Sequence, residues 1–296
     1  MTNSEKQGLS LALFAFITWG FVVIFYKFMT HISPYEIIAH RVIWSFLFLF
    51  ILLILFRRFD AVINILKTPQ IRYLLLFSGL LIVSSWCVFV YAINSSNIVE
   101  AALGNFSAPI FQMVGGFLFF GERLSRAGKI AFALVVAAVA VQFIELGSLP
   151  FVSVFIAISV AAYALVRKKV GVGAYEGLFT ETMFTLPLAI VYIMIMPSHF
   201  GMNLDGLMLS LNGVVTVVPL LAFTAATVRV RMSTLSLLQY ITPTIALFIA
   251  VLLYGEPLPM YKVVSFSLIW LAIFIVSVDS VAKNSSKRQL DKFNKI

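Results

Sequence analysis

A few ionisable side chains stand inside long apolar stretches of this chain, where a charge is costly and therefore informative. Glu181 is placed about two turns into the apolar segment 175–196, where a carboxyl group could take up and release a proton. The alternative is a structural carboxylate that pairs with Arg167, Lys168 or another helix. Glu181 is therefore the candidate for proton coupling, and the structural interpretation stays open beside it.

His40 and Arg41 follow a predicted helix start by about two turns. Arg41 could bind a substrate carboxylate, or its side chain could extend to the membrane interface. His40 could titrate near neutral pH, or it could be a buried and hydrogen-bonded structural residue. Neighbouring residues point in different directions on a helix, so the two need not share a role.

Aromatic side chains near the middle of apolar segments indicate a cavity or close helix packing, because interfacial Trp and Tyr gather at segment ends. Tyr91 lies near the end of its segment and is therefore not a candidate for cavity lining. The candidates for cavity lining are Trp19, Trp44, Trp86, Tyr163 and Tyr240.

Three prolines inside apolar segments, Pro109, Pro219 and Pro243, are predicted helix breaks that could act in gating. A proline in a helix leaves a backbone carbonyl without its partner. Asn105 and Gln239 lie near two of these prolines. Each amide could form either a polar patch in a cavity or an interhelical hydrogen bond.

Other chemistry finds little support in the sequence. Cys87 is the only cysteine, so neither a disulfide framework nor a thiolate metal cluster is expected. The chain has no H-E-x-x-H motif and no Ser-His-Asp set, and most of its 12 acidic residues fall in predicted loops. We therefore expect no enzyme, no metal and no cofactor. The chain has no Walker A loop, which disfavours an ATP-driven pump. It also has no motif that resembles a selectivity filter, which disfavours a channel.

The elements that position these residues must be membrane spans. The chain is 61% hydrophobic and only 11% charged, so polar surface could not cover its core and lipid must do so. A span needs about 20 apolar residues. The candidates run over residues 9–29, 37–56, 72–94, 99–120, 127–145, 150–166, 175–196, 209–228, 234–254 and 260–279.

The basic residues predict the topology, because Lys and Arg mark cytoplasmic loops. With the N-terminus inside, all but three of the 21 Lys and Arg residues fall in inside segments, the exceptions being Lys27, Arg41 and Lys262. This split favours ten spans with both termini in the cytoplasm. It also explains the net charge of +9 without a nucleic-acid partner.

The start of the second span carries a local signal of its own. Ser33-Pro34-Tyr35-Glu36 is typical of an N-cap residue, a proline in the first helical turn and a capping-box glutamate.

An internal repeat divides the chain into two halves. Pro109, Gly121 and Glu122 are each followed 134 residues later by the same residue type, at Pro243, Gly255 and Glu256. We predict five spans in residues 1–145, five in 146–282, and a polar, disordered cytoplasmic tail over 283–296. Five is odd, so the second half would be inverted, as in transporters that work by alternating access. The repeated Gly-Glu is interpreted as a structural feature of helix ends, with a gating role as the alternative.

Several short motifs give the chain a family resemblance. They are His40-Arg41-Val42-Ile43-Trp44-Ser45, Gly147-Ser148-Leu149-Pro150, Leu165-Val166-Arg167-Lys168-Lys169, Glu181-Thr182-Met183, Val217-Val218-Pro219-Leu220 and Gln239-Tyr240-Ile241. With these motifs over about residues 8–280, the chain resembles the drug/metabolite transporter superfamily, in the branch with two EamA-type repeats.

The resemblance implies an all-α permease of the bacterial inner membrane, with ten transmembrane helices around a central cavity. It implies export of a small metabolite, such as an amino acid or a related compound. We expect this export to be either proton-linked or facilitated. The expected partners are that solute, membrane lipid and protons, and the expected assembly is a monomer or a homodimer.

Overall fold

The computed structural model describes residues 2–94, 98–146, 151–255 and 257–293, and this part of the chain is helical apart from short connections. Ten of its helical segments are long and apolar enough to cross a membrane, which confirms the predicted fold class. In chain order, the helices are α1 (Asn3–Lys27), α2 (Pro34–Leu55), α3 (Phe59–Lys67), α4 (Pro69–Asn94), α5 (Ile98–Phe120), α6 (Arg126–Leu146), α7 (Phe151–Val170), α8 (Ala174–Ile195), α9 (Leu204–Thr227), α10 (Met232–Gln239), α11 (Ile241–Phe248), the π-helix η1 (Ile249–Leu253) and α12 (Met260–Phe293).

The surface of the bundle is apolar. Ile144, Met194 and Leu252 are 79%, 80% and 79% exposed, although water would disfavour such side chains. Lipid is the solvent that suits this surface, so the helices form a multi-pass membrane protein.

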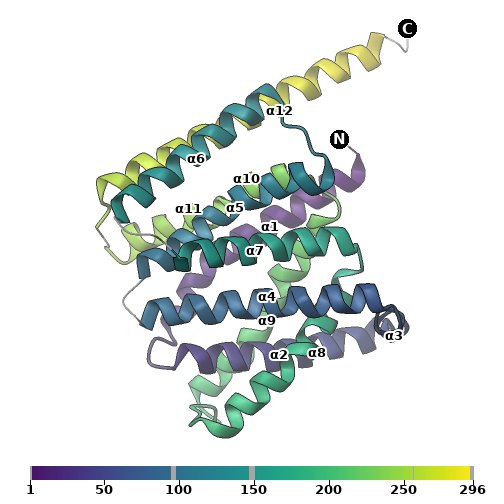
Figure 1. The fold of residues 1–296 in the computed structure, drawn as a ribbon, viewed down its shortest axis with the longest axis vertical. Helices are drawn as coiled ribbons and strands as arrows, with labels where there is room; N and C mark the ends of the chain where they lie inside the picture. Colours follow the sequence, from purple (N-terminus) through teal and green to yellow (C-terminus); the bar gives the residue numbers. More distant parts are fainter. Residues whose placement is uncertain (1, 95–97, 147–150, 256, 294–296) are drawn as a thin grey trace.

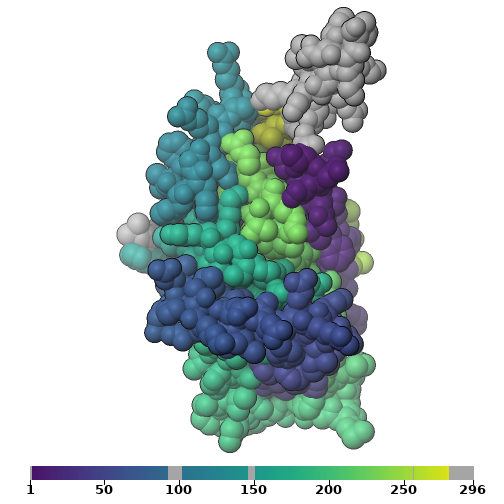
Figure 2. Space-filling model, turned by 90° about the vertical axis from the view of Figure 1, so that its right-hand side faces the viewer, coloured from purple at the N-terminus to yellow at the C-terminus, as the bar shows by residue number. Residues whose placement is uncertain are grey.

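The helices run side by side, with α6 and α12 paired along one edge and α2 and α8 near the opposite edge (Figure 1). The first helix begins and the last helix ends at the same end of the bundle. We call this the terminal end, and the other the distal end. The N-terminal residues and α3 lie at the terminal end, which faces the viewer in Figure 2.

The basic turns predicted to share one side of the membrane do gather at the terminal end. Gly8 of α1 lies against Arg229, in the turn after α9. The Lys168 ammonium group donates to the Val230 carbonyl oxygen at 2.6 Å. The shared position agrees with an even number of membrane crossings.

Helix packing follows a symmetric pattern. Helix α2 packs on α8, α6 on α12, and α5 on α10, so the second span contacts the seventh, the fifth contacts the tenth and the fourth contacts the ninth. The other contacts come in matched pairs, since α4 packs on α7 as α1 packs on α9. The candidate site lies where these contacts converge.

The helices depart from the prediction at α3 and at the C-terminal tail, and the ninth span has the break predicted near Pro243. Helix α3 was not predicted, because its nine residues are too few for a span. The ninth span is broken into α10, α11 and η1, since Pro243 cannot donate to the carbonyl of Gln239 one turn earlier. The predicted disordered tail is wrong for residues 283–293, which prolong α12. This stretch has no proline or glycine, and extending a formed helix needs no new nucleus.

The predicted capping box at the start of the second span is also wrong. Helix α2 begins at Pro34 with Ser33 as its N-cap, but no side chain caps it. The Glu36 carboxylate instead accepts hydrogen bonds from Ser198 Oγ at 2.7 Å and from the His199 backbone N–H at 2.6 Å. Glu36 therefore fastens the connection between α8 and α9 to α2.

Helices α2 and α9 approach each other closely at Gly213. A methyl group at this position would lie 2.5 Å from the Trp44 carbonyl carbon, and backbone cannot move away as a flexible side chain can. We expect Gly213→Ala to lower the free energy of unfolding by about 1–3 kcal/mol, measured by denaturant or thermal unfolding of the purified protein. Gly128→Ala is the matched control, because its added methyl group would meet nothing closer than 3.4 Å. Equal stability of the two variants would contradict this packing.

Candidate functional site

A cavity of about 540 Å³ lies between the helices and extends from the middle of the bundle toward the distal end, where Ala250 and Lys262 line it. Helices α1, α4, α5, α7, α9 and α11 supply most of its wall. The lining includes these residues predicted from the sequence: Trp19, Arg41, Trp86, Asn105, Pro109, Tyr163, Gln239, Tyr240 and Pro243. Their proximity is a structural fact, and their roles in transport stay predictions.

Other predicted residues lie away from this cavity. The His40 ring is buried and stacks on Phe200 with 5.0 Å between ring centroids, and the Trp44 ring lies 5.8 Å from the same phenylalanine. Both rings therefore pack against the connection between α8 and α9 and not against the cavity. Pro219 lies within α9, which continues through it without a break. The prediction that Trp44 lines the cavity is thus wrong. His40 does not line it either and is the buried structural residue that was the alternative for it. The predicted helix breaks at Pro219 and Pro109 are also wrong, because α9 and α5 continue through them.

Several lining residues escaped the sequence argument, among them Tyr26, Gln142, Phe223 and Lys262. Lys262 carried a usable signal, because it was one of three basic residues on the predicted outer side. Gln142 carried another, because it is an amide inside a predicted span. Tyr26 and Phe223 are ordinary aromatic residues of apolar segments, and only the fold distinguishes them.

Arg41 projects from α2 into the cavity between two aromatic rings. Its guanidinium carbon lies 4.6 Å from the Trp86 ring centroid and 5.3 Å from that of Tyr26. The guanidinium donates to the Tyr26 hydroxyl, and that hydroxyl donates to Asn212 Oδ1 at 2.9 Å. Arg41 therefore faces the cavity and does not extend to the membrane interface.

Glu181 lies beside the cavity in a buried polar cluster. Its Oε1 accepts a hydrogen bond from Ser78 Oγ at 2.5 Å and lies 3.6 Å from Arg167 Nη1. Its Oε2 lies 3.4 Å from the Tyr163 hydroxyl, which donates to it. Arg167 is buried as well.

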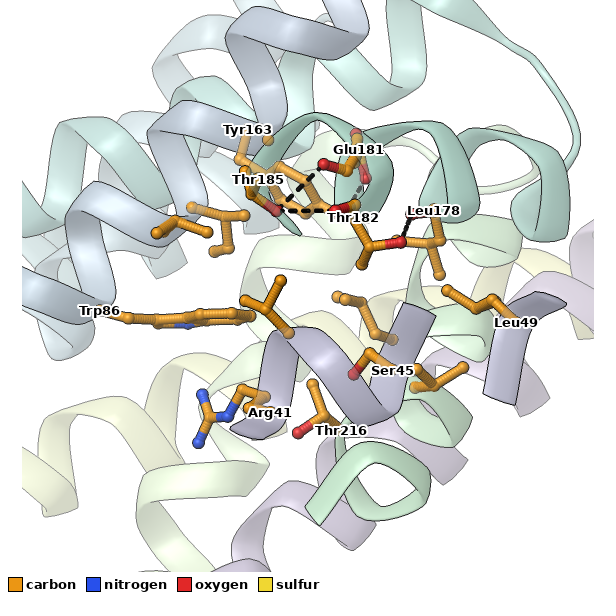
Figure 3. Close-up of a pocket in the computed structure, with 16 residues that line it drawn as sticks. Arg41, Ser45, Leu49, Trp86, Tyr163, Leu178, Glu181, Thr182, Thr185 and Thr216 are labelled. Atoms are coloured by element: carbon orange, nitrogen blue, oxygen red, sulfur yellow. Dashed lines mark hydrogen bonds between the residues drawn. The ribbon is translucent and has the colours of Figure 1, made fainter. Parts of the chain in front are cut away.

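A chamber of about 30 Å³ separates Glu181 from Arg41, which is room for about one water molecule. Figure 3 shows Glu181, Thr182 and Thr185 on one side of this chamber and Arg41 and Thr216 on the other, with the Trp86 ring between them. Trp86, Tyr163 and Arg41 line both the chamber and the main cavity. The chamber beside the carboxyl group is therefore a neighbour of the main cavity.

Glu122 holds the helices together at the terminal end. Its carboxylate accepts hydrogen bonds from the backbone N–H groups of Met232 at 2.7 Å and Ser233 at 3.0 Å. These are the first residues of α10, so a carboxylate from the turn after α5 caps another helix. Lys168 Nζ, from the end of α7, lies 3.3 Å from the same carboxylate. We call Glu122, Lys168, Met232 and Ser233 the Glu122 clasp. The repeat-related Glu256, like the motif 147–150, lies outside the described residues.

Residues 6–144 match the model of the EamA-like transporter family. Protein RarD of Escherichia coli K12 is 40% identical over 285 residues, which cover 94% of this chain and 96% of that protein. The chain belongs to the EamA-like transporter family. An uncharacterized transporter of Vibrio cholerae is 39% identical over 293 residues, 97% of each chain. A solved crystal structure superposes on this chain with a TM-score of 0.72, over 93% of this chain and 98% of that protein chain. The two sequences are 14% identical, so this likeness supports the fold alone.

Family membership makes the chain a membrane transporter, and a transporter needs ends that can open. Glu122 itself lies outside the spans, in the turn after α5, so the protonation of its carboxyl group can be tested directly. Burial raises the pKa of the Glu122 carboxyl, but the N–H groups of Ser233 and Met232, the Ser233 hydroxyl and Lys168 together hold that pKa below its ordinary value of 4.5.

The lowered pKa of Glu122 predicts how stability depends on pH in this EamA-family chain. A carboxyl group whose pKa is lower in the folded than in the unfolded protein stabilises the fold fully when the pH is above its unfolded-state pKa. This stabilisation is lost as the pH falls through its folded-state pKa. We expect Glu122→Gln to be less stable than wild type by about 1–3 kcal/mol near pH 7. The difference should shrink as thermal unfolding is repeated in steps down to about pH 3.

The matched control for this prediction is Glu145→Gln, because Glu145 is exposed near the end of α6. Its stability should track that of wild type at every pH. A Glu122→Gln difference that stays constant from about pH 7 to about pH 3 would show that ionisation of this carboxyl does not stabilise the fold.

Proposed function

We propose that this chain is a secondary transporter that exports a small metabolite, such as an amino acid or a related compound, by alternating access. The observation that carries the proposal is the position of the cavity. It extends from the middle of the bundle to the distal end, while the Glu122 clasp joins three helix ends across the terminal end. A cavity that leads to one end and is clasped at the other is the arrangement expected of one state in such a cycle.

Two inverted repeats, residues 1–145 and 146–282, form the second part of the proposal. Gly121 and Gly255 are equivalent in the repeat, and both have positive φ, at 61° and 64°. Phe106 and Tyr240 are also equivalent, and their rings lie 5.5 Å apart. Equivalent residues that meet near the middle of a bundle suggest a pseudo-two-fold axis between them, and the matched helix pairs support it.

The proposed orientation places the terminal end in the cytoplasm of a bacterial cell and the helices in its inner membrane. The support is the concentration of Lys and Arg in the turns of that end. The distal end then faces outward, and the cavity stands in its outward-facing state. Residues 283–296 would lie in the cytoplasm.

Proton coupling through Glu181 completes the proposal. The carboxyl group accepts hydrogen bonds from Ser78 and Tyr163, and Tyr163 also lines the cavity. One water molecule in the chamber could link the carboxyl group to the solute site. A proton taken up there would weaken the pairing of Glu181 with Arg167 and so loosen a side-chain contact between α7 and α8.

The proposed function is tested by reconstituting the protein into liposomes loaded with a bacterial metabolite extract and identifying the released solutes by mass spectrometry. We expect a restricted set of solutes to leave faster than from protein-free liposomes. Ala246→Trp, which fills the cavity, should reduce that release by about tenfold or more, as for a blocked binding site. Release identical to that of protein-free liposomes would overturn the proposal.

A further inference from the structure

The charge of the cavity wall limits what it can bind. Among the described residues, the lining includes the cations Arg41 and Lys262 but no aspartate or glutamate. A cavity whose charged groups all carry the same sign, and whose walls are otherwise apolar, attracts ligands of the opposite charge and repels ligands of the same charge. An organic cation would therefore meet repulsion in this cavity without a compensating carboxylate.

Arg41 is prepared for an anionic partner that the described protein does not supply. None of the ion pairs found among the described residues includes Arg41, and its Nε is buried without a hydrogen-bond partner. A guanidinium group away from water is costly unless it is paired. Its planar fork matches the two oxygens of a carboxylate, and the rings of Trp86 and Tyr26 hold it in place.

The remainder of the cavity suits a flat apolar body. The Trp19 and Phe223 rings lie 5.5 Å apart on one wall, and Phe106 with Tyr240 forms another. Gln142 is nine-tenths buried, and the Nε2 of its amide, like the Oε1 of Gln239, has no hydrogen-bond partner among the described residues. Such buried polar atoms normally find a ligand or an ordered water.

From these contacts we infer that the solute is a small organic acid with a planar ring, whose carboxylate pairs with Arg41 while its ring lies among Trp19, Trp86 and Tyr240. This inference rests on the proposed function, because it takes the cavity to be the transport site. It narrows the solute from small metabolites in general to organic anions. A free amino acid fits less well, since no described carboxylate in the lining would receive its ammonium group.

The test compares matched probes on the purified protein in detergent. Phenylacetate, phenylacetamide and phenethylamine share one body and carry an anionic, a neutral and a cationic group. Binding is measured by calorimetry or by thermal stabilisation, which follows mass action. We expect phenylacetate to bind about tenfold or more tightly than the amide, because a charged hydrogen-bonded pair is worth about 1.5–3 kcal/mol. Phenethylamine should bind most weakly.

Variants locate the anion at Arg41. Arg41→Gln should weaken phenylacetate about tenfold or more and leave phenylacetamide nearly unchanged, whereas Arg41→Lys should fall between wild type and Arg41→Gln. The matched control is Lys27→Gln, because Lys27 is a cation toward the distal end that stacks over Tyr254 outside the cavity lining. It should bind all the probes as wild type does.

Three results would overturn the inference: equal binding of phenylacetate and phenylacetamide, tightest binding of phenethylamine, or unchanged phenylacetate binding in Arg41→Gln. Tighter binding of phenyl phosphate than phenylacetate would also overturn it, by pointing to phosphate esters. These outcomes differ from a failure of the proposed function, because liposomes could still release solutes of another class.

Discussion

Replacing Arg167 with leucine is expected to lower the free energy of unfolding by about 3–5 kcal/mol, because it strands a buried carboxylate without its partner. Arg167 and Glu181 are both buried, and the nearest atoms of the two groups are 3.6 Å apart. The effect should appear as a shift of the unfolding midpoint in denaturant or on heating.

The double variant Arg167→Leu with Glu181→Leu is the control for this expectation. Replacing both partners of a buried ion pair by apolar residues is often nearly neutral, so the double variant should regain most of the loss. If it is as unstable as Arg167→Leu alone, the defect lies in the packing of α7 and not in an unpaired charge.

Replacing Glu181 with glutamine is expected to abolish the response of transport to a pH gradient. The amide keeps the shape of the side chain, and its oxygen can accept the hydrogen bond from Ser78 while its NH2 group donates to the Tyr163 hydroxyl, but it cannot bind and release a proton. Solute flux in liposomes should fall to the rate that wild type shows without a gradient.

Glu176→Gln is the matched control, since Glu176 is a second buried carboxylate of α8 that pairs with Arg58 at 3.6 Å and lines neither the chamber nor the cavity. Its flux should keep the gradient response. If Glu181→Gln keeps the response as well, Glu181 is not the coupling residue, and a facilitated mechanism or another carboxyl group must be considered.

Much of the fold could be predicted because the membrane imposes a length and a composition on each span. Apolar runs divided at charged residues, proline and glycine gave ten segments, and the described part of the chain has ten helical segments that could cross a membrane. Helix α3 escaped because a nine-residue amphipathic helix is too short for that signal. Pro243 indicated a break in the ninth span. The break itself lies at Tyr240, and this position depends on how α10 and α11 pack.

The site was harder to predict, because a side chain's role depends on which helix it faces. Arg41 and His40 are adjacent in sequence, yet Arg41 lines the cavity and His40 packs on Phe200. The direction of each side chain around α2 decides this, and a single sequence does not fix that direction. The capping box at Glu36 failed for a related reason, because distant Ser198 and His199 take its carboxylate.

The pairing of Glu181 with Arg167 was among the alternatives seen in the sequence, and the distance between the two side chains supports the pairing. The partners of Glu122 could not be foreseen in the same way. Two of them are backbone N–H groups at the start of α10, and backbone donors carry no signal in the residue types. The repeated Gly-Glu indicated from the sequence that this position matters, but it did not indicate which groups Glu122 contacts.

The most direct test of transport through this cavity is whether one residue in it can be reached from both faces of the membrane. Asn105 lines the cavity and is exposed within it. In a Cys87→Ser background, Asn105→Cys is labelled with a membrane-impermeant thiol reagent in sealed vesicles of both orientations. We predict labelling from both faces, faster from the distal side. Adding Glu122→Ala should raise the rate from the terminal side by about tenfold, which corresponds to about 1.4 kcal/mol. Labelling from the distal face alone, with or without Glu122→Ala, would mean a blind pocket and would contradict alternating access.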